Sequence, residues 1–169
     1  MGYGDALNSK DDLKGRDGID LLARMIYSEA GNQTEEGKRG CAFVAKNRKD
    51  WNETQFGGNT WEGVILKANQ FAGMTTTHAL KPDTTSDAWK DSLDIAHNLS
   101  GKINPIGGCL WFNTSSLYQK QSKKEGERNT INLEKVLIQR KTVSLFLIQH
   151  RNILIFVIFY SLWELINQG

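Results

Sequence analysis

Apolar residues recur at steps of three and four between Asp17 and Gly31, which is the spacing of an amphipathic helix. Asp17 or Asp20 can accept hydrogen bonds from the first free amides, and Gly31 suits a left-handed closing position. The pattern places one carboxylate, that of Glu29, on the apolar face near the C-terminal end of the helix. The predicted buried stripe consists of Ile19, Leu22, Met25, Ile26 and Glu29.

Three further helices follow from the same reasoning. A second helix begins after Thr34, whose hydroxyl can cap it, and Thr60 can cap a short third helix. A fourth helix opens at Thr85 or Ser86 and closes at Gly101. The predicted inner positions are Cys41, Val44, Ala45 and Arg48 in the second helix, Trp61, Val64 and Ile65 in the third, and Trp89, Leu93 and Ala96 in the fourth.

Two segments lack helical periodicity. Residues 69–85 are polar and are predicted to form an irregular loop that ends near its proline. Residues 107–116 leave a glycine turn and are rich in apolar and aromatic side chains, which predicts a short strand.

Composition excludes several kinds of protein. The 169 residues suffice for one domain with a core, and the formal net charge is only +2, without the basic stripe that nucleic-acid binding needs. Cys41 and Cys109 lack any metal-ligand spacing and are expected to be small buried residues, with a single disulfide as the alternative. No metal site is predicted, because each histidine stands alone: His78, His97 and His150.

The two ends of the chain differ from its middle. Residues 1–17 form a polar, glycine-rich arm without the apolar stretch of a secretory signal. Residues 118–169 open with a charged run and end in an apolar tail. The part from Val143 to Ile166 is long enough to span a membrane only if the polar and charged residues 149–152 lie inside the membrane. Placing such side chains in lipid is energetically costly. A buried helix or strand pair and a weak membrane anchor both fit this tail.

The position of Glu29 raises the question of its chemistry. A carboxylate on an apolar face, near the negative end of a helix dipole, keeps its proton more readily than a free acid. A neutral carboxylic acid is what a glycosidase uses to protonate the leaving sugar oxygen. The competing interpretation is a structural acid held by backbone donors, and periodicity alone favours it.

The segment LLARMIYSEAGNQTEEGKRGCAFVAKNRK, residues 21–49, resembles the opening of the SleB/CwlJ cell wall hydrolases, the cortex-lytic family of spore-forming bacteria. The residues that carry the resemblance are Ala23, Arg24, Tyr27, Glu29, Ala30, Glu36, Gly37, Asn47 and Arg48. The resemblance continues downstream in the same order and covers residues 18–115. The downstream residues are Gln70 and Phe71 in VILKANQF, and Phe112 and Asn113 in the aromatic GGCLWFNTS.

The resemblance implies an α+β, helix-rich, lysozyme-like single domain with a small β-sheet, expected over residues 18–117. It implies that Glu29 is the catalytic acid of an enzyme that cleaves peptidoglycan between N-acetylmuramic acid and N-acetylglucosamine. Relatives act as lytic transglycosylases where the product is known, and some are named amidases. The expected partner is the glycan strand, without cofactor or metal, at the spore or cell envelope, although the sequence has no recognisable signal peptide.

The chain departs from the family pattern just after Glu29. Many relatives have Arg-Gly-Glu where this chain has Gly31, Asn32 and Gln33, so a second acid is absent there. A two-carboxylate hydrolase needs that acid, whereas in a transglycosylase the C6 hydroxyl of the muramic sugar is the nucleophile. Glu36 is expected to complement the dipole of the second helix. The departure therefore favours a transglycosylase with a single acid and base.

Sugars bind to flat apolar faces bordered by hydrogen-bonding groups. Trp111 and Phe112 alternate across the predicted strand, so one of them is expected to face the site. Trp61 and Trp89 lie on helix stripes and are expected to pack in the core. The predicted substrate-binding residues are Tyr27, Gln70, Phe71, Trp111, Phe112 and Asn113.

Two function classes stay open from the sequence. The first is a peptidoglycan-cleaving enzyme, a lytic transglycosylase or alternatively an amidase that frees the muramic acid from its L-alanine. The second is a degenerate, non-catalytic protein that keeps a glycan-binding or membrane-associated surface. After residue 117 the family resemblance ends, which raises the hypothesis that the apolar tail is an out-of-frame extension.

Overall fold

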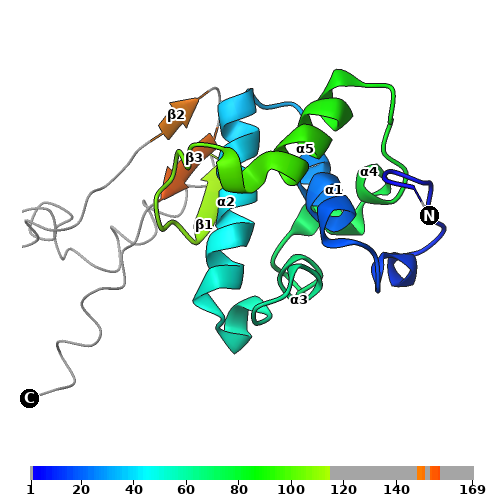
Figure 1. Cartoon of the computed structure of the whole chain (residues 1–169), viewed down its shortest axis with the longest axis horizontal. Helices are drawn as coiled ribbons and strands as arrows, with labels where there is room; N and C mark the ends of the chain where they lie inside the picture. The colour runs from blue at the N-terminus through cyan, green and yellow to red at the C-terminus, as the bar shows by residue number, and fades with distance from the viewer. Residues whose placement is uncertain (1, 115–147, 151–152, 157–169) are drawn as a thin grey trace, which may run out of the picture. The chain divides into compact units, whose positions relative to one another are not determined.

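The computed structural model describes residues 2–114, 148–150 and 153–156 (Figure 1). These residues belong to two units, divided after Pro105. The described elements of the first unit are helical, with η denoting a 3₁₀ helix: η1 (Lys10–Leu13), α1 (Gly18–Ala30), α2 (Glu35–Trp51), η2 (Thr54–Phe56), α3 (Trp61–Ile65), η3 (Ala72–Thr75), α4 (Thr77–Leu80), α5 (Asp87–Asn98) and η4 (Leu99–Gly101). The described strands of the second unit are β1 (Trp111–Thr114), β2 (Ile148–His150) and β3 (Ile153–Phe156).

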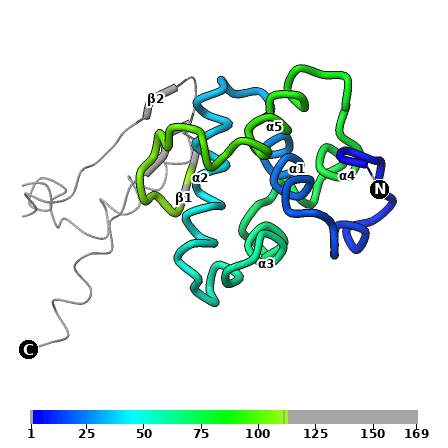
Figure 2. Tube along the Cα trace, in the orientation of Figure 1, coloured from blue at the N-terminus to red at the C-terminus, as the bar shows by residue number. Residues whose placement is uncertain are grey.

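Helix α1 is the centre of the first unit. It contacts α2, α3, α4, α5 and η3, and Figures 1 and 2 show α2, α3, α4 and α5 on different sides of it. Asp17 caps the helix as predicted, because its Oδ1 accepts a hydrogen bond from the Ile19 amide at 2.8 Å. Leu22, Met25 and Ile26 are buried. The burial of these apolar side chains against several neighbouring elements stabilises α1 more than helix propensity does.

The predicted N-caps of the other helices are confirmed. The hydroxyl of Thr34 accepts from the third amide of α2 at 3.3 Å, and Thr60 does the same for α3 at 3.0 Å. Ser86, rather than Thr85, caps α5 by accepting from the amide of Trp89 at 3.2 Å. The predicted inner residues of α2 are all buried: Cys41, Val44, Ala45 and Arg48.

The prediction that Gly31 closes α1 in the left-handed conformation is wrong. Gly31 has φ −57° and ψ −30°, which is right-handed helical backbone. A Cβ at this position would lie 2.5 Å from the carbonyl oxygen of Tyr27. The glycine is therefore required by the close approach of the backbone and not by its dihedral angles.

Residues 69–85 also differ from the predicted irregular loop, because they contain η3 and α4. Met74 and Ala79 supply the buried contacts that order these short helices. In α5, Leu93 is half-buried and Ile95 is fully buried in its place, so the inner stripe is shifted from the predicted one. The helix ends at Asn98 and passes directly into η4, before the predicted closing glycine.

The polar N-terminal arm packs against the helices of the first unit, to which it belongs. The side chains of Leu7 and Leu13 are buried, and the amide of Leu7 donates to the carbonyl oxygen of Leu80 at the end of α4, at 2.9 Å. Two isolated leucines in a polar stretch are a weak sequence signal, but they are enough to anchor the arm. Both cysteines are buried and form no disulfide, as the main interpretation expected: Cys41 and Cys109.

The described part of the second unit contains a three-stranded antiparallel sheet in the order β1-β3-β2. Trp111 pairs with Phe156, and His150 pairs with Ile153. Strand β1 lies within the segment for which the sequence predicts a strand. Strands β2 and β3 come from the apolar tail and not from residues 18–117, so the small sheet of a lysozyme-like domain stays a prediction. The predicted limits of that domain likewise stay a prediction.

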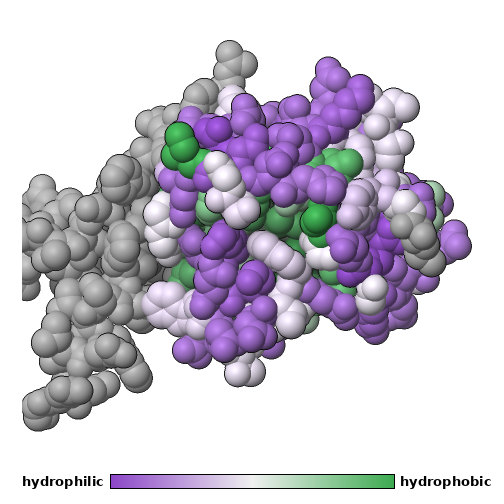
Figure 3. All heavy atoms as spheres, in the orientation of Figure 1, coloured by the Kyte–Doolittle hydropathy of each residue, from purple (hydrophilic) through white to green (hydrophobic). Residues whose placement is uncertain are grey.

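Within the described ranges, no helix combines the length and apolar character needed to cross a membrane. Most of Val143 to Ile166, the proposed membrane-associated segment, lies outside those ranges. The face of the first unit seen in Figure 3 is largely hydrophilic, with apolar atoms visible in recesses between polar side chains.

Candidate active site

Glu29 lies in the last turn of α1, on the face that the sequence pattern assigned to it. Its side chain is half-buried, and its Oε1 accepts a hydrogen bond of 2.5 Å from the backbone amide of Gly73 in η3. This bond joins two segments that lie 44 residues apart in the chain. It fixes the orientation of the carboxyl group against the end of its own helix.

Gly73 reaches Glu29 because it has no side chain. A Cβ on Gly73 would lie 2.7 Å from the Oγ of Ser28 and 2.8 Å from the carbonyl carbon and oxygen of the same residue. Contacts under 3.0 Å require a shift, and the backbone of Ser28 is fixed inside α1. The amide of residue 73 can therefore approach the carboxylate only when that residue is glycine.

Glu29 lines a cleft at the end of α1. The cleft has a volume of about 450 Å³. Its lining residues come from the end of α1, from the turn that follows it, from α4 and from α5. They are Tyr27, Ser28, Glu29, Gly31, Asn32, His78 and Ala88.

Tyr27 supplies an aromatic wall of this cleft. Its ring makes edge-to-face contacts with the ring of His78, at 6.1 Å between centroids, and with the ring of Trp89, at 5.8 Å. Its hydroxyl oxygen accepts a hydrogen bond from the amide of Asp83 at 3.4 Å. Tyr27 is half-buried and His78 is exposed, so the wall presents aromatic and polar groups to an entering molecule.

The surroundings of Glu29 favour the protonated form. Burial raises the pKa of Glu29 above the ordinary value of 4.5, and the Gly73 hydrogen bond and the charge of Arg48 only partly oppose this rise. A neutral carboxyl group can donate a proton, which a free carboxylate in water cannot do near neutral pH.

Arg48 is the charged residue of α2 that acts on Glu29. Only 3% of it is exposed, and its guanidinium carbon lies 4.9 Å from the ring centroid of Phe71 and 5.4 Å from that of Phe56. Burial lowers the pKa of Arg48 to about 10, so it stays positively charged at neutral pH. Burial raises the pKa of the nearby Cys41 thiol, which therefore stays neutral.

The structure brings only part of the predicted site together. Tyr27 lines the cleft with Glu29. Gln70 and Phe71 line a second cleft of about 550 Å³, next to η1 and α3, and Phe71 is only 3% exposed. Trp111, Phe112 and Asn113 lie on β1, in the second unit. Their assignment as glycan contacts stays a prediction, as does that of Gln70 and Phe71.

The tryptophans expected in the core divide into two cases. Trp89 is buried as predicted. Trp61 is half-buried, and the Nζ of Lys49 lies 5.4 Å from its ring centroid.

Sequence reasoning missed two residues of this site, Gly73, which holds Glu29, and His78, which lines the cleft. Gly73 contributes only its backbone amide, and no side-chain pattern marks such a donor. His78 was interpreted as an isolated histidine, because its place beside Tyr27 depends on α4, which the sequence did not predict. Among the described residues, no group of three histidine, cysteine or acidic side chains is arranged to hold a metal ion.

The first unit is helix-rich and places the half-buried acid Glu29 beside an open cleft, an arrangement that is compatible with a glycan-cleaving enzyme. Residues 32–136 match the family model described as Cell Wall Hydrolase, and the chain belongs to this SleB/CwlJ-type family. No curated protein and no solved structure matches the chain. Family membership supports a peptidoglycan-degrading, hydrolytic role at the cell envelope or spore. The matched range begins three residues after Glu29, so the role of Glu29 itself stays a prediction.

Proposed function

We propose that this protein is a peptidoglycan lytic transglycosylase that cleaves the bond between N-acetylmuramic acid and N-acetylglucosamine, with Glu29 as its single acid and base. The observation that carries the proposal is the half-buried Glu29, whose carboxyl group is held by the Gly73 amide and which lines the cleft. The raised pKa of this group supports its use as a proton donor.

The hydrogen bond from Gly73 assigns different tasks to the two carboxyl oxygens. Oε1 accepts the amide proton, so Oε2 is the oxygen that carries the acidic proton. That proton passes to the glycosidic oxygen as the bond to the muramic C1 breaks. The muramic C6 hydroxyl then attacks C1 and returns its own proton to Oε2, which closes a 1,6-anhydro ring and restores the acid.

The composition of the cleft favours this mechanism over hydrolysis by two carboxylates. Among the described residues, Glu29 is the only acid that lines the cleft. Two-carboxylate glycosidases need a second acid within about 5–10 Å of the first, as nucleophile or as base for water. Glu36 lies in the first turn of α2 and is not part of the cleft lining. A nucleophile supplied by the substrate removes the need for a second acid.

The Tyr27 wall supports glycan binding at the same cleft. An aromatic ring can cover one apolar face of a sugar, while the carboxyl of Glu29, the amide of Asn32 and the imidazole of His78 offer hydrogen bonds around it. We also propose spore cortex or vegetative wall peptidoglycan as the substrate and spore germination or wall turnover as the setting.

Product analysis tests the proposal directly. Purified protein is incubated with spore cortex fragments and with vegetative peptidoglycan, and the products are identified by mass spectrometry. We expect 1,6-anhydromuropeptides from the wild type and none from Glu29→Gln, because a glutamine can accept from Gly73 but cannot donate the acid proton. Glu36→Gln is the matched control, and it is expected to retain activity.

The alternatives predict different products. Free muramic reducing ends would indicate hydrolysis, and new amino termini of alanine would indicate an amidase. Binding of glycan without any new product would favour the degenerate, non-catalytic protein. Each of these three outcomes would refute the transglycosylase mechanism.

A further inference from the structure

The N-terminal segment Gly2–Leu7 is tied to the elements that hold the cleft wall. The amide of Gly4 donates to Oδ1 of Asp20 in α1 at 2.8 Å, deep in the structure. The carbonyl oxygen of Asp5 accepts from the guanidinium of Arg24 at 2.7 Å. Leu7 is buried and bonds to the end of α4. A polar arm that only needed to stay soluble would not require these contacts.

Gly4 is the point of closest contact in this segment. Its φ of +80° is a left-handed conformation that favours glycine. A Cβ on Gly4 would lie 2.6 Å from the Cγ2 of Thr84 and 2.7 Å from the Cζ2 of Trp89. The backbone at residue 4 therefore packs directly against the Trp89 ring and against the loop before α5.

Tyr27 is supported by one of these neighbours, Trp89, and by the residue next to the other, Asp83. The ring of Trp89 contacts the ring of Tyr27 edge to face, and the residue before Thr84, Asp83, donates its amide to the Tyr27 hydroxyl. A displacement of the N-terminal segment would thus reach Tyr27 through both its ring and its hydroxyl.

Arg24 connects the same segment to His78. Its guanidinium is fully buried and donates to the carbonyl oxygens of Ala79 at 2.8 Å and Leu80 at 3.3 Å, besides that of Asp5. Its Nε donates to Asp20 at 2.7 Å. Since Ala79 follows His78 directly in α4, these bonds fix the backbone that carries the imidazole.

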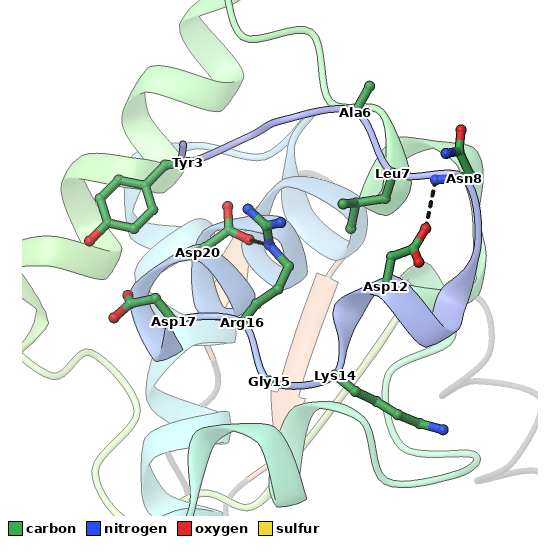
Figure 4. Close-up of a pocket in the computed structure, with 10 residues that line it drawn as sticks. All are labelled: Tyr3, Ala6, Leu7, Asn8, Asp12, Lys14, Gly15, Arg16, Asp17 and Asp20. Atoms are coloured by element: carbon green, nitrogen blue, oxygen red, sulfur yellow. Dashed lines mark hydrogen bonds and ion pairs between the residues drawn. The ribbon is translucent and has the colours of Figure 1, made fainter. Parts of the chain in front are cut away.

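Asp20 completes the network. Burial alone would raise its pKa, but hydrogen bonds from Arg16, Arg24 and Gly4 outweigh burial and hold the pKa of Asp20 below its ordinary value. Figure 4 shows Arg16 and Asp20 joined beneath the chain that runs from Tyr3 to Leu7. The carboxylate therefore stays ionised and holds both arginines and the segment together.

We propose that the segment Gly2–Leu7 positions the aromatic wall of the glycan cleft, through Gly4 on Tyr27 and through Arg24 on His78. Gly4 and Arg24 are positioning residues, because each acts through another side chain. The proposal rests on the proposed function insofar as the wall binds glycan. It gives Gly2–Leu7 a role in substrate binding, although this segment lies outside residues 32–136, the range that matches the family.

The test compares two glycine variants of the full chain. Gly4→Ala places a Cβ against Trp89 and Thr84, whereas Gly15→Ala shares the left-handed strain, with φ +71°, but its Cβ meets no atom within 4 Å. We expect the aromatic NMR signals of Tyr27 to shift in Gly4→Ala and not in Gly15→Ala. Arg24→Lys keeps a positive charge beside Asp20, but a lysine cannot donate to all the acceptors that Arg24 holds. The backbone of α4 should therefore be held less firmly, and we expect the ring signals of His78 to shift.

Glycan affinity gives the second measurement. In the inactive Glu29→Gln background, Gly4→Ala is expected to weaken binding of a tetrasaccharide of alternating N-acetylglucosamine and N-acetylmuramic acid by on the order of fivefold, which corresponds to one aromatic contact. Gly15→Ala is expected to leave the affinity unchanged.

The results separate this proposal from the proposed function. If the wild-type protein releases no anhydromuropeptides, the proposed function fails, and the ring signals alone decide whether the segment positions the wall. Unchanged signals of Tyr27 in Gly4→Ala and of His78 in Arg24→Lys would overturn the positioning role. Equal losses of glycan affinity in Gly4→Ala and Gly15→Ala would also overturn it, because the loss would then come from the left-handed backbone strain that both variants share. Should Gly4→Ala not fold, the signals of His78 in Arg24→Lys decide.

Discussion

Replacing Gly73 with alanine tests how Glu29, the proposed catalytic acid, is held. The added Cβ would lie 2.7 Å from the Oγ of Ser28 and 2.8 Å from its carbonyl group. Because the Ser28 backbone belongs to α1, η3 must move away from the helix, and the 2.5 Å bond between the Gly73 amide and Glu29 lengthens or breaks. The substitution thus disturbs the backbone donor of Glu29 and crowds Ser28, while every side chain that lines the cleft keeps its chemical identity.

The magnitude follows from the two contacts that change. Crowding a packed contact costs about 1–3 kcal/mol of folding stability, and loss of the hydrogen bond costs roughly 1 kcal/mol. The effect on catalysis is larger in relative terms, because a misplacement of about 1 Å can cost on the order of a hundredfold in rate. We therefore expect kcat of Gly73→Ala to fall by on the order of a hundredfold while the protein remains folded at 25 °C.

The assay is release of anhydromuropeptides from cortex fragments, measured beside a thermal unfolding curve. Gly101→Ala is the matched control, since its Cβ meets no atom within 4 Å. A folded Gly73→Ala variant with the kcat of the wild type would refute the reasoning, because the amide would then not hold the acid in its working position.

Two further predictions concern ionisation of Glu29. Arg48→Met removes a positive charge that lowers the pKa of Glu29, so the loss of kcat with rising pH is expected to move to higher pH. Lys46→Met, which removes another cation of α2, is expected to leave the pH profile in place. Because the pKa of Glu29 is raised in the folded state, its contribution to stability is present below the ordinary value of 4.5 and is lost as pH rises through the raised pKa. Urea unfolding between about pH 4 and 8 should therefore show Glu29→Gln gaining stability over the wild type as pH rises, and a constant difference would contradict the assigned burial.

The sequence predicted the parts of the fold that depend on side-chain periodicity. Helix α1 with its cap Asp17 and α2 with its cap Thr34 follow from apolar spacing and from capping hydroxyl or carboxyl groups. The stripe of α2 is buried as predicted, whereas Ile19 and Glu29 in the stripe of α1 are half-buried. The same spacing placed Glu29 on the inner face. These features are local, so a single sequence contains the information that sets them.

The parts that the sequence did not predict depend on contacts between distant segments. Helix α4 has four residues and lies in a polar stretch, and it is ordered by Ala79 and by the guanidinium of Arg24, 55 residues away. The place of His78 in the cleft follows from α4. Gly31 was expected to adopt a left-handed conformation. Instead, a glycine is needed there because a Cβ would lie too close to the Tyr27 carbonyl oxygen. None of these pairings leaves a periodic signal.

Two glycines support the proposed site, each at a close contact where an added Cβ would crowd its neighbours. Gly73 allows a backbone amide to reach the acid, and Gly4 allows the N-terminal segment to press against the Trp89 ring that supports Tyr27. One contact fixes the group that would transfer the proton, whereas the other fixes a surface that would bind the sugar. Since interactions that change only in the transition state alter kcat and uniform binding alters KM, we expect Gly73→Ala to act mainly on kcat and Gly4→Ala mainly on KM. Matched losses of kcat in both variants would mean that the acid and the wall move as one body.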